Sequence, residues 1–135
     1  MKALIQRVSE ASVTIGGECV AAIGRGYLVL FSVTHADTAA MADELARKTV
    51  ALRIFEDDHG KTNRSIVDVA GAVIVVSQFT LYASYRKGNR PDYLNSAHPS
   101  IAEPLYEYFT EYIMWRGCGR PWDPSGSAPG ALAPT

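Results

Sequence analysis

The stretch Ala72-Val73-Ile74-Val75-Val76 is a run of five apolar residues that follows Gly71 and leads directly into Ser77-Gln78-Phe79-Thr80-Leu81. A short apolar run rich in β-branched side chains is typical of a strand that is covered on both faces. Tyr27–Val33 is a second run of this kind, and it follows the break Gly24-Arg25-Gly26. The two runs therefore predict two strands that are buried on both sides.

Shorter strands are expected elsewhere, at Ala3–Val8, Ser12–Ile15, Glu18–Ile23 and Arg53–Phe55. The pair Gly16-Gly17 suits the positive φ angles of a hairpin turn, so the second and third of these strands are expected to pair. The fourth is expected to stop at Glu56–Gly60, which has the composition of a solvated turn.

Apolar residues at helical spacing predict two helices. The first is expected to begin at a cap formed by Asp37 or Thr38, and its apolar positions are Met41, Ala42, Leu45, Ala46 and Leu52. The second is expected to begin near Ser100–Glu103, which has the capping-box spacing, with Pro104 shifting the start by a residue or two. Its apolar stripe is Ile101, Leu105, Tyr108, Phe109 and Tyr112. Strands and helices together predict a mixed α/β (α+β) domain.

Length and charge limit the classes of function. The chain has 135 residues and a formal net charge of −1, which fits one domain. Proteins that grip a long stretch of nucleic acid are usually basic, so extended backbone binding is disfavoured, whereas a small contact at one end of a nucleic acid stays open. Residues 117–135 contain eight Gly or Pro, so we expect residues 1–116 to form the domain and the rest to be a mobile tail.

Cellular location is predicted from what the sequence lacks. The longest apolar run is too short to cross a bilayer, and the first residues have no signal-peptide core. Cys19 and Cys118 stand far apart and without a CxxC motif, which argues against a disulfide framework or a zinc site. We therefore expect a soluble cytoplasmic protein that does not bind a membrane.

Common catalytic motifs are missing as well. His35, His59 and His98 are isolated and are expected to be surface histidines. There is no GxSxG elbow and no P-loop, and the acidic trio Glu56-Asp57-Asp58 is better explained as a solvated turn than as a cation site. The sequence therefore predicts neither a metal nor a cofactor.

Ser77–Leu81 brings hydroxyls, an amide and an aromatic ring to the end of a buried strand. These groups either satisfy local backbone atoms or form a pocket floor, where Phe79 would stack on a base or ribose. A Ser or Thr nucleophile needs a neighbouring base, and no His or Lys stands at a suitable spacing. We therefore expect positioning and electrostatics rather than covalent catalysis. The loop Arg86–Pro91, with three cations in five positions, is either a solvated face or a clamp for one or two phosphates.

Several blocks in series resemble the D-aminoacyl-tRNA deacylases. Ser77–Leu81 matches the SQFTL signature of that family in full. The other blocks are Met1–Val8 with Ala11–Val13, Leu52–Phe55 with Gly60–Asn63 (Thr62 standing where the family more often has Met), Lys87–Pro91, and the helix through Leu105 and Tyr106. The resemblance covers about residues 1–113.

The resemblance implies a function and a set of site residues. It implies a homodimer with layered β-sheets that form a barrel-like core with two main helices. It implies hydrolysis of the ester between a D-amino acid and the 3′-terminal adenosine of tRNA, or of glycine from glycyl-tRNA mischarged on tRNA-Ala, assisted by the ribose 2′-hydroxyl. The implied catalytic residues are Ser77, Gln78, Phe79 and Thr80. The implied substrate-binding residues are Gln6, Arg7, Leu81, Lys87, Arg90, Pro91 and Ala97. A binder of aminoacyl-tRNA acceptor ends without turnover is the alternative.

One part of the family pattern is missing. The family carries Asn-x-Gly-Pro-Val-Thr near its C-terminus, whose Gly-cisPro element rejects L-amino acids, and nothing after Tyr112 matches it. A shifted reading frame, a divergent relative and a rebuilt specificity each explain this difference. The resemblance therefore implies weakened discrimination between D- and L-amino acids.

Overall fold

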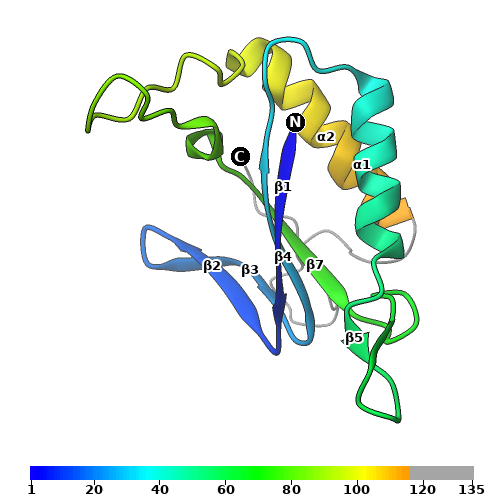
Figure 1. Ribbon diagram of the computed structural model, residues 1–135. Coiled ribbons are helices and arrows are strands. Elements are labelled where there is room, and N and C mark those ends of the chain that lie inside the picture. The colour runs from blue at the N-terminus through cyan, green and yellow to red at the C-terminus, as the bar shows by residue number, and fades with distance from the viewer. Residues whose placement is uncertain (116–135) are drawn as a thin grey trace.

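The central sheet of the computed structural model has three strands in the order β1-β4-β7 (Figure 1). β1 spans Lys2–Val8, β4 spans Gly26–Ser32 and β7 spans Ala72–Ser77. β1 runs antiparallel to β4, and β7 runs parallel to it. The structure describes residues 1–115, so the expected tail and Cys118 lie outside the described residues.

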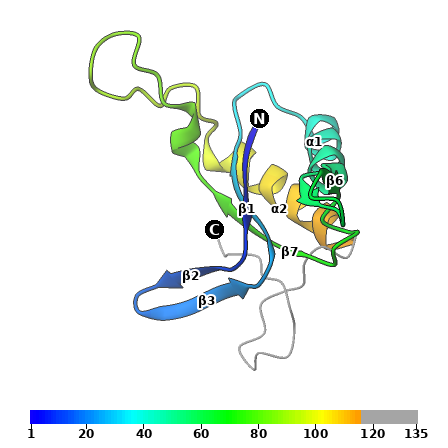
Figure 2. The ribbon, with the colours of Figure 1, turned by 60° about the horizontal axis from the view of Figure 1, so that its bottom comes forward.

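Two helices cover one face of this sheet, and a hairpin covers the other (Figures 1 and 2). The helices are α1 (Ala39–Ala51) and α2 (Pro99–Trp115), and the hairpin is formed by β2 (Ala11–Ile15) and β3 (Glu18–Ile23). Side chains of β7 alternate between the two layers, as a pleated strand requires. Val73 and Val75 join the core on the helix side, whereas Ala72 and Ile74 pack with Ala21 and Ile23 of the hairpin. The predictions of strands buried on both sides, of layered sheets and of two helices are confirmed.

Glycine is required where β4 meets β7. A Cβ atom on Gly26 would lie 1.7 Å from the carbonyl oxygen of Ala72, so a larger residue cannot fit there. Gly16 and Gly17 have φ angles of 58° and 82°, and β2 and β3 pair across them, which confirms the predicted hairpin.

The expected strand Arg53–Phe55 is displaced toward the C-terminus. β5 covers only Phe55–Glu56, and it pairs with β6 (Thr62–Arg64), which the sequence did not indicate. Arg53 contacts β6 through its side chain instead, since its Nε donates to the backbone oxygen of Asn63 at 3.0 Å.

Helix α1 confirms the predicted segment but buries a slightly different face. Thr38 is its N-cap residue, and the buried residues are Ala42, Ala46, Thr49 and Val50. Met41 is exposed, and Leu52 forms the C-cap instead of packing in the core.

Helix α2 begins one residue before the predicted capping box. His98 forms the start, because its Nδ1 accepts from the Ser100 N–H and its carbonyl accepts from the N–H groups of Ile101 and Ala102. The proline at the first helical position is Pro99, where the missing N–H costs nothing.

The buried face of α2 is rotated relative to the predicted stripe. Leu105 and Phe109 are buried as predicted, but Ile101 and Tyr108 are exposed, and Tyr106 and Ile113 are buried in their place. Phe109 stacks on Phe31, with 4.5 Å between ring centroids, which fixes this rotation. None of the helices in residues 1–115 is long and apolar enough to cross a membrane.

The sheet register places three strand ends at one edge of the molecule. Lys2 pairs with Ser32, and Phe31 pairs with Ser77. The start of β1 therefore lies beside the carboxyl ends of β4 and β7. In sheets with parallel strands, ligands commonly bind outside these carboxyl ends.

Candidate functional site

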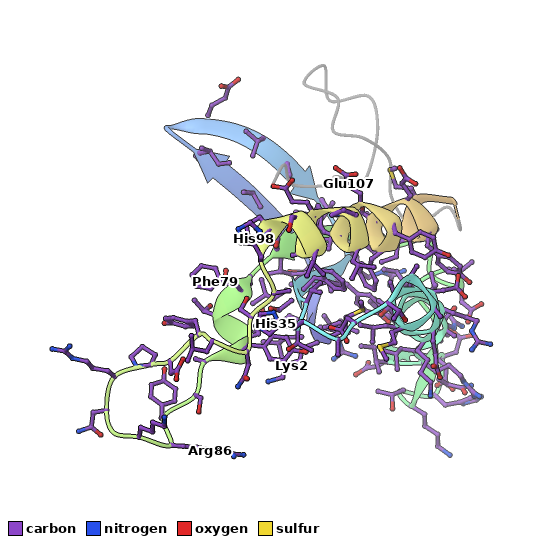
Figure 3. The ribbon with its side chains drawn as sticks, turned by 90° about the horizontal axis from the view of Figure 1, so that it is seen from above. Lys2, His35, Phe79, Arg86, His98 and Glu107 are labelled. Carbon is purple, nitrogen blue, oxygen red and sulfur yellow. The ribbon has the colours of Figure 1, made fainter. Side chains whose placement is uncertain are left out.

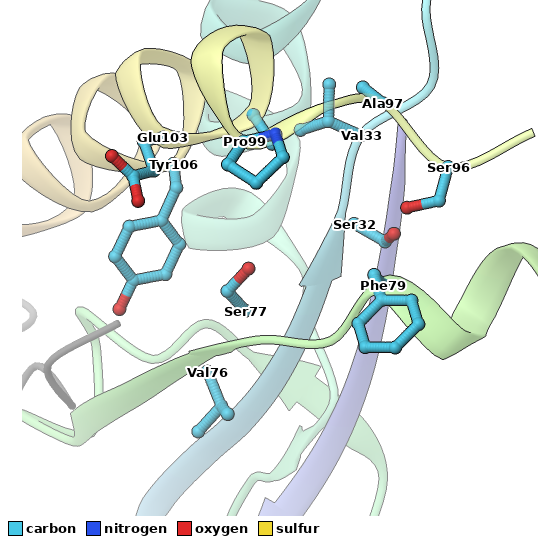
Figure 4. A pocket seen from close by; sticks show the side chains of 11 residues that line it. Ser32, Val33, Val76, Ser77, Phe79, Ser96, Ala97, Pro99, Glu103 and Tyr106 are labelled. Carbon is cyan, nitrogen blue, oxygen red and sulfur yellow. The ribbon is translucent and has the colours of Figure 1, made fainter. Parts of the chain in front are cut away.

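A pocket of about 480 Å³ opens at the carboxyl ends of β4 and β7 (Figure 4). Its walls are the strand ends, the 3₁₀ helix η1 (Phe79–Tyr82), the segment that precedes α2, and the first turns of α2. The pocket is mostly apolar and has a few hydroxyls, a composition typical of a small-molecule site.

Ser77 and Phe79 both line this pocket. The Ser77 hydroxyl points into it from the end of β7 (Figure 4). The Phe79 ring is 57% exposed and rests edge-on against Tyr93, with 5.2 Å between ring centroids. The backbone N–H of Gln78 donates to the Phe31 carbonyl at 2.7 Å, which holds the chain against β4 just before η1 begins. The exposed face of Phe79 is therefore held at the pocket mouth.

Gln78 and Thr80 do not line the pocket, although the sequence groups them with Ser77 and Phe79. The Gln78 Nε2 donates a hydrogen bond to the Thr80 Oγ1, so the two side chains satisfy one another. Gln78 and Thr80 therefore match the first of the two alternatives, in which polar side chains satisfy local groups. Ser77 and Phe79 match the second, in which the segment forms the floor of a pocket.

Ala97 closes the side of the pocket opposite β7. It is buried, and its N–H donates to the carbonyl of Val33 at 2.9 Å. This bond ties the segment before α2 to the end of β4, so the two walls of the pocket are joined at this point.

Ser32 is a pocket residue that the sequence did not indicate. Its side chain is only 3% exposed, and its Oγ has no hydrogen-bond partner among residues 1–115. A buried hydroxyl without a partner is costly, so a polar ligand atom at this position would be stabilised. The feature of the sequence that could have indicated Ser32 is the presence of a hydroxyl near the end of the apolar run Tyr27–Val33.

Tyr106 and Glu103 are two further pocket residues that sequence reasoning missed. The Tyr106 O–H donates to the Val75 carbonyl at 2.9 Å, and burial raises the pKa of this phenol to about 12. Tyr106 therefore stays a neutral donor at physiological pH. Glu103, on the first turns of α2, supplies the one carboxylate among the residues that line the pocket. The observed rotation of α2 brings both residues into the pocket wall. The spacing of apolar residues in the sequence had instead predicted that a neighbouring face of the helix is buried.

Glu103 is the one potential side-chain proton acceptor of the carboxylate, imidazole or amine type among the residues that line the pocket. Among its lining residues there is no histidine, lysine or cysteine. His98 is close in sequence, but its Nδ1 is within 3.0 Å of the Ser100 hydroxyl. The site can therefore seat an aromatic group on Phe79 and offer hydroxyls to polar atoms, which agrees with positioning rather than covalent catalysis.

Gln6 and Arg7 lie far along the sheet from this pocket. Arg7 pairs with Tyr27, four residues before Phe31 on β4, which is a separation of about 14 Å along a strand. The Arg7 guanidinium donates to the Ile54 carbonyl at 2.6 Å and lines a different depression, beside Arg25 and Phe55. Gln6 is exposed on β1.

The cationic loop projects from the body of the molecule (Figure 1). Lys87, Arg90 and Pro91 are exposed and line none of the depressions described here. Paired backbone hydrogen bonds between Ser84 and Asp92 close the base of the loop. Leu81, just before it, is half-buried, and its carbonyl accepts from the Lys2 ammonium at 3.0 Å.

The residues considered as metal ligands occupy surface positions. His35, His59 and His98 are exposed, as predicted. The Asp57 carboxylate accepts from the backbone N–H groups of Lys61 and His59, which lower its pKa and confirm the turn. Within residues 1–115, no cluster of three or more His, Cys, Asp or Glu side chains could hold a metal ion.

Comparison with known proteins places the chain in a family. Residues 4–118 match the model of the family described as D-Tyr-tRNA(Tyr) deacylase. The D-aminoacyl-tRNA deacylase of Opitutus terrae is 56% identical over 121 residues, which cover 90% of this chain and 80% of that protein. The D-aminoacyl-tRNA deacylase of Thermus aquaticus is 54% identical over 117 residues, which cover 87% of this chain and 77% of that protein.

Solved structures share the fold. One described as "c-Myc DNA Unwinding Element Binding Protein" superposes with a TM-score of 0.81 at 38% identity, covering 98% of this chain and 85% of its own. A second, described as a probable eukaryotic D-amino acid tRNA deacylase, has a TM-score of 0.75 at 16% identity, which shows the fold alone. The family model, the relatives and the signature around the pocket agree, and this chain belongs to the D-Tyr-tRNA(Tyr) deacylase family.

Proposed function

We propose that this chain hydrolyses the ester bond of D-aminoacyl-tRNA, releasing the free D-amino acid and the tRNA. The observation that carries the proposal is the open pocket at the ends of β4 and β7, where Ser77 and Phe79 of the family signature meet Ala97. Relatives with 54–56% identity over most of the chain carry the name of this activity.

The pocket supports a mechanism of positioning. Phe79 offers an exposed ring on which the terminal adenine can stack, and stacking of this kind is tolerant of sequence. Ser77 and the unpartnered Ser32 offer hydroxyls to the polar atoms of the ester and ribose. Because no histidine or lysine lines the pocket, the substrate's own 2′-hydroxyl would assist the attack of water on the ester carbon. The carbonyl–oxygen bond to the ribose then breaks, and the ribose oxygen takes a proton.

Four further residues have supporting roles in the proposed activity: Gln78, Thr80, Gln6 and Arg7. Gln78 and Thr80 brace the turn that presents Phe79, through their mutual hydrogen bond. Gln6 and Arg7 are too far along β1 to touch a substrate in the pocket of the same chain. We propose that they take part through a homodimer, in which a second copy brings β1 near the pocket.

The remaining finer features are proposals as well. We propose a barrel-like core, to which both β1 and β7 could contribute, since neither outer edge pairs with a further strand within residues 1–115. We propose that the protein is cytoplasmic and that glycyl-tRNA mischarged on tRNA-Ala is a second substrate. We also propose that the tRNA, where its end leaves the pocket, contacts Leu81, Lys87, Arg90 and Pro91. A solved relative is titled as a DNA-element binding protein, but a net charge of −1 argues against a grip on a long duplex.

The test is release of D-amino acid from D-aminoacyl-tRNA by the purified full chain, with folding checked by circular dichroism. Turnover above the rate of spontaneous hydrolysis is expected. Binding of a non-hydrolysable aminoacyl-adenosine analogue without any turnover, even at high concentrations of folded enzyme, would replace the proposal with the alternative of a silent acceptor-end binder. A duplex DNA control is expected to show no binding at physiological salt.

A further inference from the structure

We propose that a second pocket, beside the first, binds a backbone phosphate of the single-stranded RNA that leads into the site. This pocket has a volume of about 380 Å³ and lies between the start of β1, the end of η1 and the base of the cationic loop. The residues that carry the inference are Lys2, Tyr82, Tyr85, Arg86 and Asn95. The inference rests on the proposed function, because it assigns a place to the strand whose end the first pocket holds.

The two pockets meet η1 at its opposite ends. Phe79, at the start of η1, lines the first pocket, and Tyr82, at its end, lines the second. In Figure 3, Lys2 and Arg86 lie on one side of η1 and His98 lies on the other. Three residues of 3₁₀ helix span about 6 Å, and successive nucleotides of a stacked strand rise about 3.4 Å. A strand whose terminal base stacks on Phe79 therefore brings a phosphate one or two nucleotides back to this second pocket.

The two cations of the second pocket, Lys2 and Arg86, form no ion pair within residues 1–115. The described residues form two ion pairs, Met1 amine with Asp37 and Arg64 with Asp58, and neither involves Lys2 or Arg86. Arg86 makes no hydrogen bond within residues 1–115. Of the nearby carboxylates, Asp37 pairs with the Met1 amine, and Asp92 accepts a hydrogen bond from the N–H of Leu94. A phosphate would supply the missing negative charge.

Lys2 is held in position for such a ligand. Its ammonium donates to the Leu81 carbonyl at 3.0 Å and lies 4.5 Å from the centroid of the Tyr82 ring. An ammonium has three N–H donors, so two stay available. The register of β1 fixes the backbone of Lys2 opposite Ser32, which lines the first pocket.

The walls of the pocket suit RNA more than a small anion. Tyr85 is 60% exposed next to Arg86, and a ring beside cations is the usual surface for single-stranded nucleic acid. The Asn95 carbonyl accepts from the Thr34 hydroxyl, and this bond fixes the far wall. Lys87 and Arg90, by contrast, are on the exposed part of the loop and line neither of these two pockets. The pocket cations, rather than these loop cations, should therefore contribute most to strand binding.

The experiment measures binding of a fluorescent single-stranded RNA ending in CCA to the full chain by anisotropy, across a salt series. The double variant Lys2→Gln/Arg86→Gln is expected to weaken binding about tenfold at low salt. It should reduce the slope of log K against log salt by about 0.7 for a lost phosphate contact on a single strand. The control Arg47→Gln/Lys61→Gln removes the same charge from exposed positions elsewhere and is expected to bind almost as the wild type does.

Two further comparisons decide the matter. The variant Lys87→Gln/Arg90→Gln is expected to lose less affinity than the pocket variant. The pocket variant is expected to hydrolyse D-aminoacyl-adenosine, which has no phosphate, at the wild-type rate, but to need a higher KM for D-aminoacyl-tRNA with kcat unchanged. An equal loss of RNA binding in the pocket variant and in the Arg47/Lys61 control would overturn the inference, as would a larger loss in the Lys87/Arg90 variant. If the wild type hydrolyses neither substrate, the proposed function fails, and the binding series still decides whether the phosphate pocket exists.

Discussion

The phenol of Tyr106 on α2 donates a hydrogen bond to the backbone carbonyl of Val75 on β7, 2.9 Å away. This bond joins the helix that forms one wall of the main pocket to the strand that carries Ser77. It also occupies the phenol, which therefore serves the shape of the pocket and not the chemistry within it.

Replacing Tyr106 with Phe is expected to lower the free energy of unfolding by about 1 kcal/mol near neutral pH, because the Val75 carbonyl loses its donor. The difference should shrink above pH 10 and change sign by pH 12, where the buried phenol makes the wild type the less stable protein. Burial raises the pKa of the Tyr106 phenol from 10.0 to about 12, so folding favours its neutral form. The resulting stability is complete below pH 10 and is lost as pH rises from 10 to 12, by about 2 kcal/mol.

Urea unfolding of wild type and Tyr106→Phe at several pH values measures this effect. Tyr85→Phe, at an exposed position, is the control and should stay within about 0.5 kcal/mol of wild type throughout. A difference between wild type and Tyr106→Phe that stays constant from pH 8 to pH 12 would contradict the assignment.

Phe79→Ala is expected to reduce kcat/KM for D-aminoacyl-tRNA by about 10- to 100-fold, because a base loses its stacking surface. The melting temperature should change little, since the ring is 57% exposed. Ile15→Ala removes a similarly exposed side chain on the β2–β3 hairpin, away from the pocket, and should leave kcat/KM unchanged. Wild-type kinetics in Phe79→Ala would show that the ring does not seat the substrate.

Ser32→Ala separates folding from binding. The Ser32 hydroxyl is buried without a partner in residues 1–115, which costs about 1–3 kcal/mol, so its removal should preserve or raise the melting temperature. The same change should raise KM severalfold if the hydroxyl meets the substrate. Ser12→Ala on the exposed face of β2 is the control. A lower melting temperature with unchanged KM would mean that the hydroxyl supports the fold instead.

Gly26→Ala is expected to destabilise the protein by about 3 kcal/mol or more, because the new methyl group would overlap the Ala72 carbonyl and force β4 away from β7. Gly24→Ala, two residues earlier, meets no atom within 4 Å and should be nearly neutral. Chemical unfolding of the two variants compares them directly. Equal stabilities would mean that the parallel pairing has a different register.

The absence of Asn-x-Gly-Pro-Val-Thr from the sequence predicts a smaller ratio of D- to L-aminoacyl-tRNA hydrolysis than in a family member that has this signature. Rates on both substrates, measured in parallel for the two proteins, test it. A ratio as large as that of the comparison enzyme would show that this chain excludes L-amino acids by other residues.

The sequence was sufficient to predict the strands with the strongest local signals. Tyr27–Val33 and Ala72–Val76 are apolar on both faces, and the Gly16-Gly17 turn has a simple backbone requirement, so local chemistry determines them. The face that α2 buries could not be predicted with the same certainty, because apolar and aromatic residues flank it on both sides. Contacts with Phe31 and Val75, distant in sequence, select Tyr106 over Tyr108.

The same distinction explains the candidate site. The signature predicted a pocket at Ser77–Thr80, and of these residues Ser77 and Phe79 line the main pocket, next to Ala97. It could not indicate that Gln78 and Thr80 bond to each other, because a 3₁₀ turn, unlike a continued strand, does not alternate its side chains between two faces. The sequence did not indicate Ser32, because it lies within an apolar run typical of a core strand. It did not indicate Glu103, because this residue lies within a segment with the ordinary pattern of a helix.

The parallel pairing of β4 with β7 has a consequence for synthesis of the chain on the ribosome. β1 and β4 can pair as soon as Ser32 has emerged, but β7 is added only about forty residues later, and α2 later still. Until then β4 lacks its β7 neighbour on one edge and the cover of α2 on one face, so the nascent chain is prone to aggregate. Chaperone demand should therefore be greatest before residue 77 leaves the exit tunnel, and it should fall once Phe109 can cover Phe31.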